Sequence, residues 1–131
     1  MTDHPGFLTR PDYRVDIHAR RNLITVHHDE RLVAESIRAL LVDEQDHGLV
    51  FYLPRADVRV QLVADESRAS TCPFKGAATY WRFDGDGGEA IVWSYEDPAP
   101  QVARLRGHVA FFQDRVHLRV GVATPAVSGR D

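Results

Sequence analysis

The stretch STCPFKGAATYW (residues 70–81) holds the only cysteine and the only lysine of the chain, Cys72 and Lys75. All remaining basic side chains are arginine. Lysine carries a compact ammonium on a flexible stem, whereas the arginine guanidinium is wide, planar and permanently charged. A chain that otherwise uses arginine keeps lysine either by chance or because a guanidinium would fail at that position. We interpret Lys75 as a residue at the mouth of a pocket.

Two interpretations of the segment TCPFKG remain open. In the structural one it is a tight bend, in which Pro73 fixes φ, Gly76 supplies a positive φ and Cys72 packs as a small apolar residue. In the functional one Lys75 binds an anionic group, or its ammonium lowers the pKa of the Cys72 thiol and favours the nucleophilic thiolate. We expect Lys75 to be the more important of the two side chains.

The segment FYLPRADV (51–58) supplies two further candidates, Arg55 and Asp57. A guanidinium can grip phosphate or carboxylate with two parallel hydrogen bonds. In the functional interpretation Arg55 forms such a fork and Asp57 orients Arg55 or Lys75. In the alternative, Asp57 caps the following turn or pairs with a charge on a solvated surface, where an ion pair contributes only ~0–1 kcal/mol.

The ends of two expected strands carry polar residues that could face the same cleft. These are Glu35 and Ser36 in AES, and Asp43 and Glu44 in VDE. Acid–base chemistry needs groups whose pKa values are separated, and the spacing does not show that these groups converge, so a solvated strand end is the alternative. The histidine spacing does not indicate three converging ligands, and we expect no metal site.

Aromatic side chains are the largest source of apolar surface in the chain. Side chains alternate across a strand, so Tyr80 and Trp81 should face opposite sides, as should Phe111 and Phe112. We expect part of this set to be core and the rest to line a pocket or a partner surface. Cys72 and Tyr52 are the expected walls of the ligand site, and Trp81 is a further expected ligand-binding residue.

The elements that must position these residues are mostly short strands rich in β-branched and aromatic residues. Alternation predicts strands at 13–19, 23–28, 31–36, 49–54, 78–83, 89–95, 108–114 and 116–122. Residues 37–44 fit a strand or a short helix, residues 54–63 favour a short helix, and 98–107 fit one or two helical turns. DGDGG predicts a hairpin between 78–83 and 89–95, and Asp114–Arg115 predicts a final hairpin. The fold class is therefore mainly β, a single compact antiparallel-sheet domain with one or two short helices.

Composition limits the classes of protein that need to be considered. The 131 residues suit one domain, 1–131, with irregular tails at 1–12 and 123–131. A formal net charge of -3 with both signs interspersed argues against a nucleic-acid partner. No apolar run approaches the ~20 residues of a membrane span, and no export signal is visible, so we expect no membrane association and a cytoplasmic location.

Several segments together resemble the DUF427 family, small proteins of uncharacterised function. They are HARR (18–21), RLVAES, FYLPRADV, STCPFKGAATYW, WSYEDP and GHVAFF, and the resemblance runs from about residue 13 to 122. The resemblance implies a compact β-rich fold similar to the Mss4-like arrangement, and some classifications label the family a nucleotidyltransferase. This chain lacks the glycine-serine and paired-carboxylate signature of well-known nucleotidyltransferases, and it lacks the two cysteine pairs of the Mss4 zinc site.

Our leading hypothesis is a small-molecule site in which Lys75 and Arg55 hold an anionic or phosphorylated metabolite and Asp57 orients them. If chemistry follows binding, transferase-like group transfer fits these cations, with Lys75, Asp57 and Cys72 as the catalytic candidates. The residues do not indicate a cofactor. The alternative is a non-catalytic module whose aromatic segments form a partner or homodimer surface.

Overall fold

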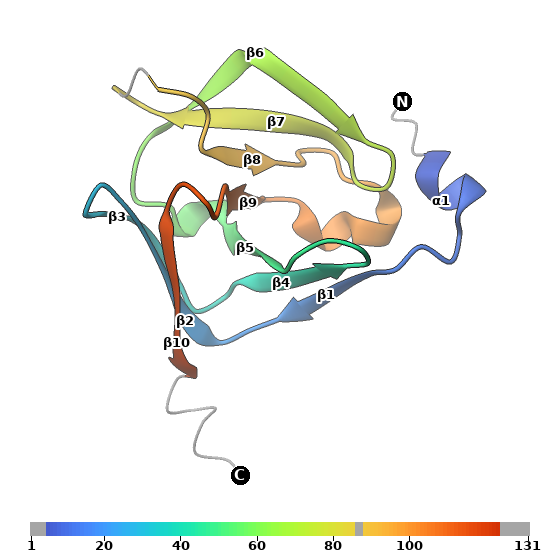
Figure 1. The fold of residues 1–131 in the computed structure, drawn as a ribbon, viewed down its shortest axis with the longest axis horizontal. Coiled ribbons are helices and arrows are strands. Elements are labelled where there is room, and N and C mark those ends of the chain that lie inside the picture. Colours follow the sequence, from blue (N-terminus) through green and yellow to red (C-terminus); the bar gives the residue numbers. More distant parts are fainter. Residues whose placement is uncertain (1–4, 86–87, 124–131) are drawn as a thin grey trace.

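The chain is mainly β, as its sequence predicts. A computed structural model describes residues 5–85 and 88–123, in which ten strands form two antiparallel sheets (Figure 1). The strands are β1 Val15–Ala19, β2 Asn22–His28, β3 Arg31–Ser36, β4 Leu40–Glu44, β5 Val50–Pro54, β6 Leu62–Cys72, β7 Gly76–Phe83, β8 Val92–Ser94, β9 His108–Phe111 and β10 His117–Ala123. A five-residue helix, α1 (Pro5–Thr9), and two 3-10 helices, η1 (Arg55–Asp57) and η2 (Pro100–Leu105), complete the elements.

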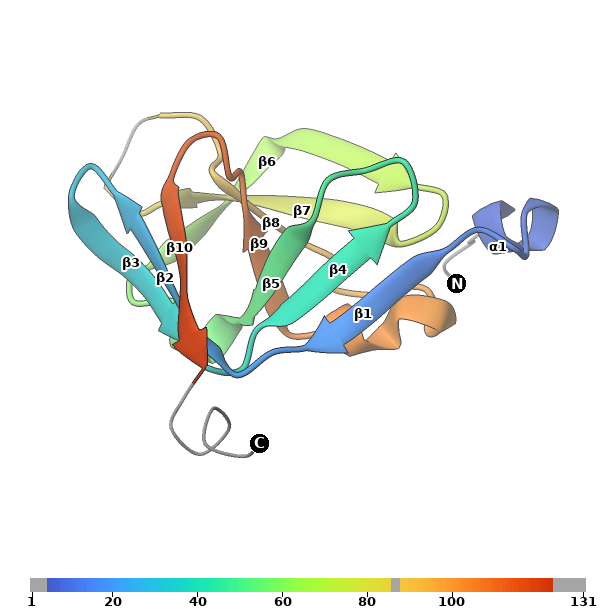
Figure 2. The same ribbon diagram turned by 60° about the horizontal axis from the view of Figure 1, so that its bottom comes forward.

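The larger sheet has seven strands in the order β1-β4-β5-β9-β8-β7-β6, and the smaller has the order β10-β2-β3. Figure 2 shows β1, β4 and β5 side by side, with the smaller sheet next to them. In the centre of the larger sheet, Leu40 of β4 pairs with Tyr52 of β5, and Tyr52 in turn pairs with Ala110 of β9. Strands from all parts of the chain therefore meet in one sheet.

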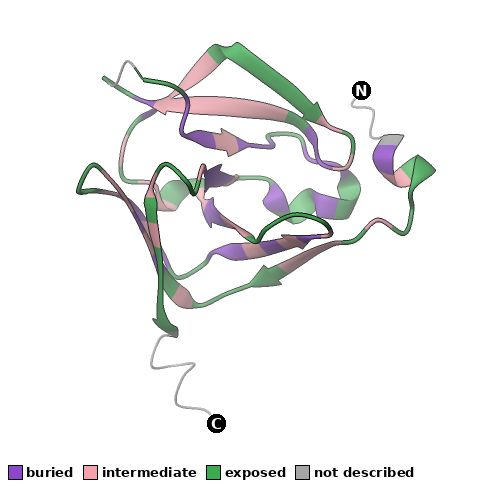
Figure 3. Cartoon of the chain, in the orientation of Figure 1, coloured by how far each residue is buried: buried purple, intermediate pink, exposed green. Residues whose placement is uncertain are grey.

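Two apolar clusters cover the two faces of the larger sheet. The inter-sheet core joins it to the smaller sheet, and its fully buried members include Ile24, Val33, Leu53, Val92 and Phe111. The second cluster, which we call the η2 core, packs the opposite face against η2 and contains Leu40, Val42, Tyr52, Tyr95, Ala99, Val102, Leu105 and Ala110. Burial follows this division: β2, β3, β4, β5, β8, β9 and η2 carry most of the buried residues (Figure 3).

Period-two alternation correctly predicts which side chains share a face. Leu53 belongs to the inter-sheet core, whereas its neighbour Tyr52 belongs to the η2 core. The same division separates Val92 from Trp93 and Phe111 from Ala110. Successive side chains of a strand point to opposite faces, so a strand between two cores contributes alternately to each.

Several expected elements have a different form or partner. Residues 37–44 resolve to β4, and 98–107 contain η2. The helix expected over 54–63 is only the three-residue η1, because Val58 is already extended and bridges Ala34. The strands expected at 78–83 and 89–95 do pair, as β7 with β8, but the DGDGG turn falls partly on residues 86–87, outside the described residues.

The final hairpin predicted around Asp114–Arg115 is wrong. β9 pairs with β5 and β8 in the larger sheet, whereas β10 pairs with β2 in the smaller one. The backbone N–H of Arg115 does donate to the carbonyl of Phe112 at 2.9 Å, so a turn is present. That turn carries the chain from one sheet to the other, because local turn chemistry specifies a change of direction and does not specify the pairing partner.

Part of the N-terminal segment that we expected to be irregular is helical. Within residues 1–12, Pro5–Thr9 forms α1, and the N–H of Gly6 donates to the carbonyl of Pro73 at 2.9 Å. A Cβ on Gly6 would lie 2.5 Å from that carbonyl oxygen and 2.6 Å from the ring of Phe74. Glycine is therefore required for α1 to approach the turn between β6 and β7. Residues 1–4 and 124–131 lie outside the described residues.

Candidate functional site

A cavity of about 580 Å³ lies on the η2-core face of the larger sheet, next to the turn that carries Lys75. Seven of its fifteen lining residues are aromatic, so its walls are predominantly apolar. The lining residues are Tyr13, Val42, Glu44, His47, Gly48, Val50, Tyr52, Cys72, Pro73, Phe74, Lys75, Tyr80, Trp93, Tyr95 and Phe112. They come from β4, β5, β6, β7, β8 and the turn between β6 and β7, and from segments outside the strands that carry Tyr13, His47, Gly48, Tyr95 and Phe112.

The β6–β7 turn places Lys75 by backbone contacts at both ends. Cys72 pairs with Gly76, and the N–H of Lys75 donates to the carbonyl of Cys72 at 3.3 Å. Gly76 has φ 115, a conformation that side-chain-bearing residues rarely adopt, which explains glycine at this position. The carbonyl of Lys75 accepts the N–H of Ala99 at 3.1 Å, which ties the turn to the segment leading into η2. The sequence prediction of a bend at TCPFKG is thus confirmed.

Lys75 is buried, with a relative exposure of 7%, and its ammonium donates to Oε1 of Glu44. Glu44 is itself buried because it continues the register of Leu40 and Val42 along β4. The hydroxyl of Tyr13 donates to the other carboxylate oxygen, Oε2, at 2.5 Å. Both oxygens of Glu44 therefore have a donor, and the carboxylate links Lys75 to Tyr13.

These contacts decide the ionisation of the cluster. Burial alone would raise the pKa of Glu44, but the hydrogen bonds from Lys75 and Tyr13, the charge of Lys75 and that of His47 outweigh it and lower the pKa. Nε2 of His47 lies 3.7 Å from Oε2. Burial, the hydrogen bond to Glu44 and the negative charge of Glu44 together raise the pKa of Tyr13 to about 12. At neutral pH the cavity thus holds a carboxylate beside a neutral phenol.

Aromatic rings form two walls around this pair. Near the turn, Tyr13 stacks on Phe74 with centroids 3.6 Å apart, and the Lys75 ammonium lies 5.9 Å from the ring centroid of Tyr95. Burial raises the pKa of Tyr95 well above its usual range. Planar walls of this kind suit a flat ligand.

The second wall contains Tyr52, Trp93, Phe112 and Tyr80. Trp93 donates its indole N–H to the Tyr52 hydroxyl at 3.1 Å and contacts Phe112 with centroids 4.8 Å apart. Tyr80 stacks on Phe112 at 6.2 Å. The guanidinium of Arg68 lies over both rings, 4.3 Å from the centroid of Tyr80 and 5.0 Å from that of Phe112. Arg68 thus places a positive charge against the outer rings of the cavity.

The comparisons with known proteins identify a family. The sequence model of the domain of unknown function DUF427 matches residues 16–121. The chain belongs to the DUF427 family. A search of curated proteins finds no significant match. The matched DUF427 region includes Glu44 and Lys75, whereas Tyr13 lies before it.

Four of the residues predicted for the site line the DUF427 cavity: Lys75, Cys72, Tyr52 and Glu44. The other four, Arg55, Asp57, Ser36 and Trp81, are not among its lining residues. The expected convergence of Arg55 and Asp57 on Lys75 is therefore wrong for this structure. Glu44 lies at the end of β4 and Val50 at the start of β5, whereas η1 follows the opposite end of β5. From Val50 to Arg55 an extended chain advances about 16 Å.

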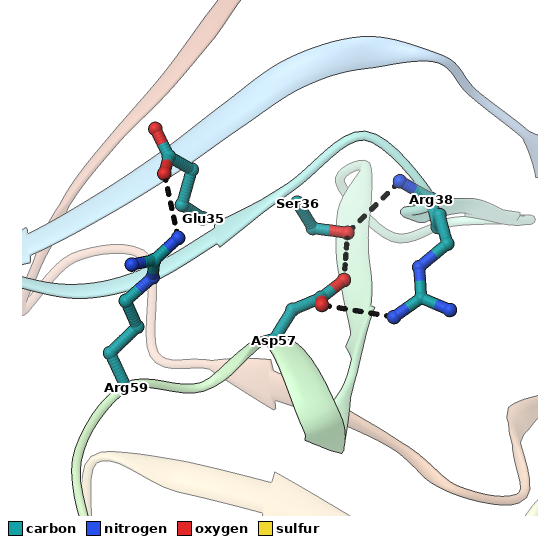
Figure 4. A network of polar contacts seen from close by, with 5 residues as sticks. All are labelled: Glu35, Ser36, Arg38, Asp57 and Arg59. Carbon is teal, nitrogen blue, oxygen red and sulfur yellow. Dashed lines mark hydrogen bonds and ion pairs between the residues drawn. The ribbon is translucent and has the colours of Figure 1, made fainter.

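Asp57 and Ser36 instead belong to a separate polar network that fastens η1 to the end of β3 (Figure 4). Ser36 donates its hydroxyl to Asp57 at 2.6 Å, and Arg38 contributes a guanidinium donor to Asp57 and a backbone donor to Ser36, both at 2.9 Å. Burial would raise the pKa of Asp57, but Arg38 and Ser36 lower it. Arg59 pairs with Glu35 beside this network at 2.8 Å. These contacts indicate that the RAD segment (55–57) has a structural role, because they hold η1 against the end of β3.

Arg55 and Trp81 contact each other on the inter-sheet side. The Arg55 guanidinium lies 4.1 Å from the ring centroid of Trp81, and the indole N–H of Trp81 donates to the hydroxyl of Ser94 at 2.9 Å. Trp81 packs against the inter-sheet core. Its neighbour Tyr80 lines the cavity, as the predicted alternation of this pair requires.

Sequence reasoning missed Tyr13, Phe74 and His47 as lining residues of the cavity, and Arg68 as a residue that packs on two of the lining rings. For Tyr13 a signal existed, since it alternates with Val15 and Ile17, two residues that pack against the η2 core. Phe74 lies inside the motif that suggested the site. Arg68 gave no signal, because it lies in the polar part of β6, where no apolar alternation marks a strand.

Neither a metal centre nor a membrane span is found in the described parts of the chain. Within residues 5–85 and 88–123, no three His, Cys, Asp or Glu side chains are grouped so that they could hold a metal ion. The helices among the same residues are all too short, or too polar, to cross a bilayer.

Proposed function

We propose that this DUF427 protein is a small-molecule-binding domain whose ligand occupies the cavity around Lys75 and Glu44. The observation that carries the proposal is a concave, aromatic-lined space of about 580 Å³ that contains a buried lysine–carboxylate pair. Ligand sites usually have volumes of about 300–1,000 Å³, apolar and aromatic walls and a few polar groups that fix orientation. This cavity has each of these properties.

The walls and charges indicate the chemical class of the ligand. Stacked and tilted rings at Phe74, Trp93 and Phe112 favour a planar group. An ammonium has three donors, and Glu44 accepts one of them, so an acceptor on the ligand can share Lys75. We therefore propose a small planar metabolite with a carboxylate or another strong acceptor, with Arg68 adding positive charge at the outer rings.

Group transfer on a phosphorylated ligand receives less support. The short name of the family model abbreviates nucleotidyltransferase. Phosphoryl chemistry depends on cations around the transferred group. In the cavity Lys75 is already paired with Glu44, and Arg55 and Asp57 lie at the other end of β5. We therefore favour binding over nucleotidyl transfer.

The alternative of an interaction module needs an exposed patch of tryptophan and tyrosine. Trp93, Tyr80 and Tyr95 instead line the concave cavity. Among the described residues the exposed large apolar side chains are Leu8, Leu23, Ile37, Leu49, Val120 and Val122. None of these is aromatic, which supports ligand binding over the alternative.

Native mass spectrometry of freshly purified protein, combined with ligand-observed NMR using small aromatic acids, tests the proposal. We expect a co-purifying small molecule, or aromatic acids that bind and lose affinity about 2–10-fold when Phe112→Ala removes one ring, since an aromatic contact contributes about 0.5–1.5 kcal/mol. Asp57→Asn, outside the cavity, is the matched control and should bind as wild type does. Absence of any binder, together with a stable homodimer in sedimentation analysis, would instead favour the interaction module.

A further inference from the structure

The cavity contains the only lysine amine of the chain, and this amine is enclosed. The Lys75 side chain is 9% exposed, and its ammonium is in contact with Glu44. The arginines elsewhere in the chain cannot do what a primary amine can do, because a guanidinium stays protonated and is a poor nucleophile. A lysine becomes a nucleophile when an apolar site and a neighbouring base release its proton.

The contacts of Glu44 supply such a base. Its Oε1 accepts from the Lys75 ammonium, while its Oε2 is held by the Tyr13 hydroxyl at 2.5 Å. A carboxylate fixed at both oxygens is positioned to take a proton from Nζ and to return it.

We propose that Lys75 is a nucleophile that forms an imine with the carbonyl group of a small aromatic aldehyde or ketone. The inference rests on the proposed function, because the same cavity must first bind the ligand. The inference adds that the ligand group next to Lys75 is a carbonyl and that the protein–ligand complex is covalent.

The step balances without a further reactant. The Lys75 ammonium gives one proton to Glu44, and the free amine attacks the carbonyl carbon to form a carbinolamine. Glu44 then returns the proton to the carbinolamine hydroxyl, which leaves as water while the C=N bond forms. The product is a protonated imine beside the carboxylate, and nothing is oxidised or reduced.

The surroundings favour this product in two ways. The Tyr95 ring, whose centroid lies 5.9 Å from Nζ, interacts favourably with a cation, and the protonated imine keeps the charge of the ammonium. The burial of Lys75 limits access of the water that would hydrolyse the imine. A solvent-exposed lysine would have neither the contact with an aromatic ring nor the protection from water.

Reductive trapping tests the inference. Adducts are easy to assign, because the 131-residue chain has only two primary amines, the α-amino group and Lys75. The protein is incubated with benzaldehyde or 4-hydroxybenzaldehyde and sodium cyanoborohydride, and adducts are located by intact-mass and peptide mass spectrometry. A thiohemiacetal at Cys72 is not trapped by this reduction. Arg119→Lys supplies the matched control, an exposed lysine on β10 outside the cavity.

We expect Lys75 to be trapped at least about tenfold faster than the lysine introduced by Arg119→Lys, and Lys75→Arg to abolish the adduct at that position. Glu44→Gln should slow trapping at neutral pH about 100-fold, the lower end of the contribution of a positioned general acid–base group. Circular dichroism of each variant confirms folding. Trapping of Lys75 that is no faster than that of the exposed lysine would overturn the inference.

A parallel arm separates this inference from the proposed function. Binding of 4-hydroxybenzyl alcohol, which has the ring but no carbonyl, is followed by ligand-observed NMR. If the alcohol binds and Lys75 is not trapped by the aldehyde, the imine is refuted and the binding function stands. If neither binding nor trapping occurs, both fail for this class of ligand.

Discussion

Lys75→Met should destabilise the protein strongly while leaving it folded. Methionine retains most of the lysine stem but leaves Glu44 buried without its cation. Removal of one partner from a buried ion pair costs about 3–5 kcal/mol. Glu44 keeps the hydrogen bond from Tyr13 and lines a cavity that opens to solvent, so we expect the lower end, about 3 kcal/mol. With an m-value of about 1.5 kcal/mol/M, the urea midpoint should fall by about 2 M.

A double-mutant cycle with Glu44→Gln isolates the interaction itself. Urea unfolding of wild type, Lys75→Met, Glu44→Gln and the double variant gives the four free energies of unfolding that the cycle needs. The double variant should be more stable than Lys75→Met, because the uncompensated carboxylate is gone, with a coupling energy of about 2 kcal/mol. A coupling energy below about 0.5 kcal/mol, typical of solvent-exposed pairs, would refute the view that the pair is enclosed.

The pH dependence of the same unfolding experiment gives a second test. The folded protein holds the pKa of Glu44 below its ordinary value of 4.5, so the unfolded chain binds more protons in the interval between the two values. The stability from ionised Glu44 is therefore complete above the ordinary value and is lost as pH falls through the folded one. Glu44→Gln should show a smaller loss of stability between neutral pH and about pH 3 than wild type does. Equal losses in the two proteins would contradict the assignment.

Two further substitutions test contacts around and away from the cavity. Gly6→Ala brings a Cβ within 2.5 Å of the Pro73 carbonyl oxygen, so it should detach α1 and cost about 1–3 kcal/mol in chemical unfolding; an unchanged midpoint would show that α1 does not pack on the turn. Asp57→Asn weakens the contacts to Ser36 and Arg38 and should cost about 1–3 kcal/mol while leaving ligand binding in the cavity intact; a loss of binding by the folded variant would restore Asp57 to the site.

The sequence predicted the faces of the sheet better than its pairing. Tyr80 lines the cavity and Trp81 packs on the inter-sheet core, and Phe112 and Phe111 divide in the same way. This outcome is local, because alternation is a property of one extended strand. The partner of each strand is set by contacts distant in sequence, which is why β9 and β10 were wrongly joined in a hairpin although both strands exist.

The polar residues show the same limit. Arg55 and Asp57 were grouped with Lys75 because all belong to motifs shared with the DUF427 family. The register Leu40↔Tyr52 and Val42↔Val50 shows that Ser36, before β4, and Asp57, after β5, must gather at one end of this strand pair. Glu44 must lie at the other end. Once the β4–β5 pairing is known, the two groups of residues separate without further information.

The β6 strand illustrates a different cause of failure. Residues 65–71 contain no apolar alternation, so nothing in their pattern indicated a strand, yet they are part of β6 at the edge of the larger sheet. An edge strand satisfies its backbone through one neighbour and gains solubility from charged side chains. Its polar sequence therefore fits its position, and its assignment as a strand depends on β7, with which it pairs.

Glu44 is the residue whose role follows most directly from sequence and register together. It continues the buried positions Leu40 and Val42 at a spacing of two, and an ionised carboxylate in such a position needs a partner, because its burial is otherwise too costly. The basic side chain that pairs with Glu44 must be long enough to reach the carboxylate from another element. Its charged group must also be small enough to fit among the aromatic side chains. Among basic side chains lysine has the more compact charge, and the chain has one lysine. The burial of Glu44 on β4 thus explains why the chain has a lysine in the β6–β7 turn.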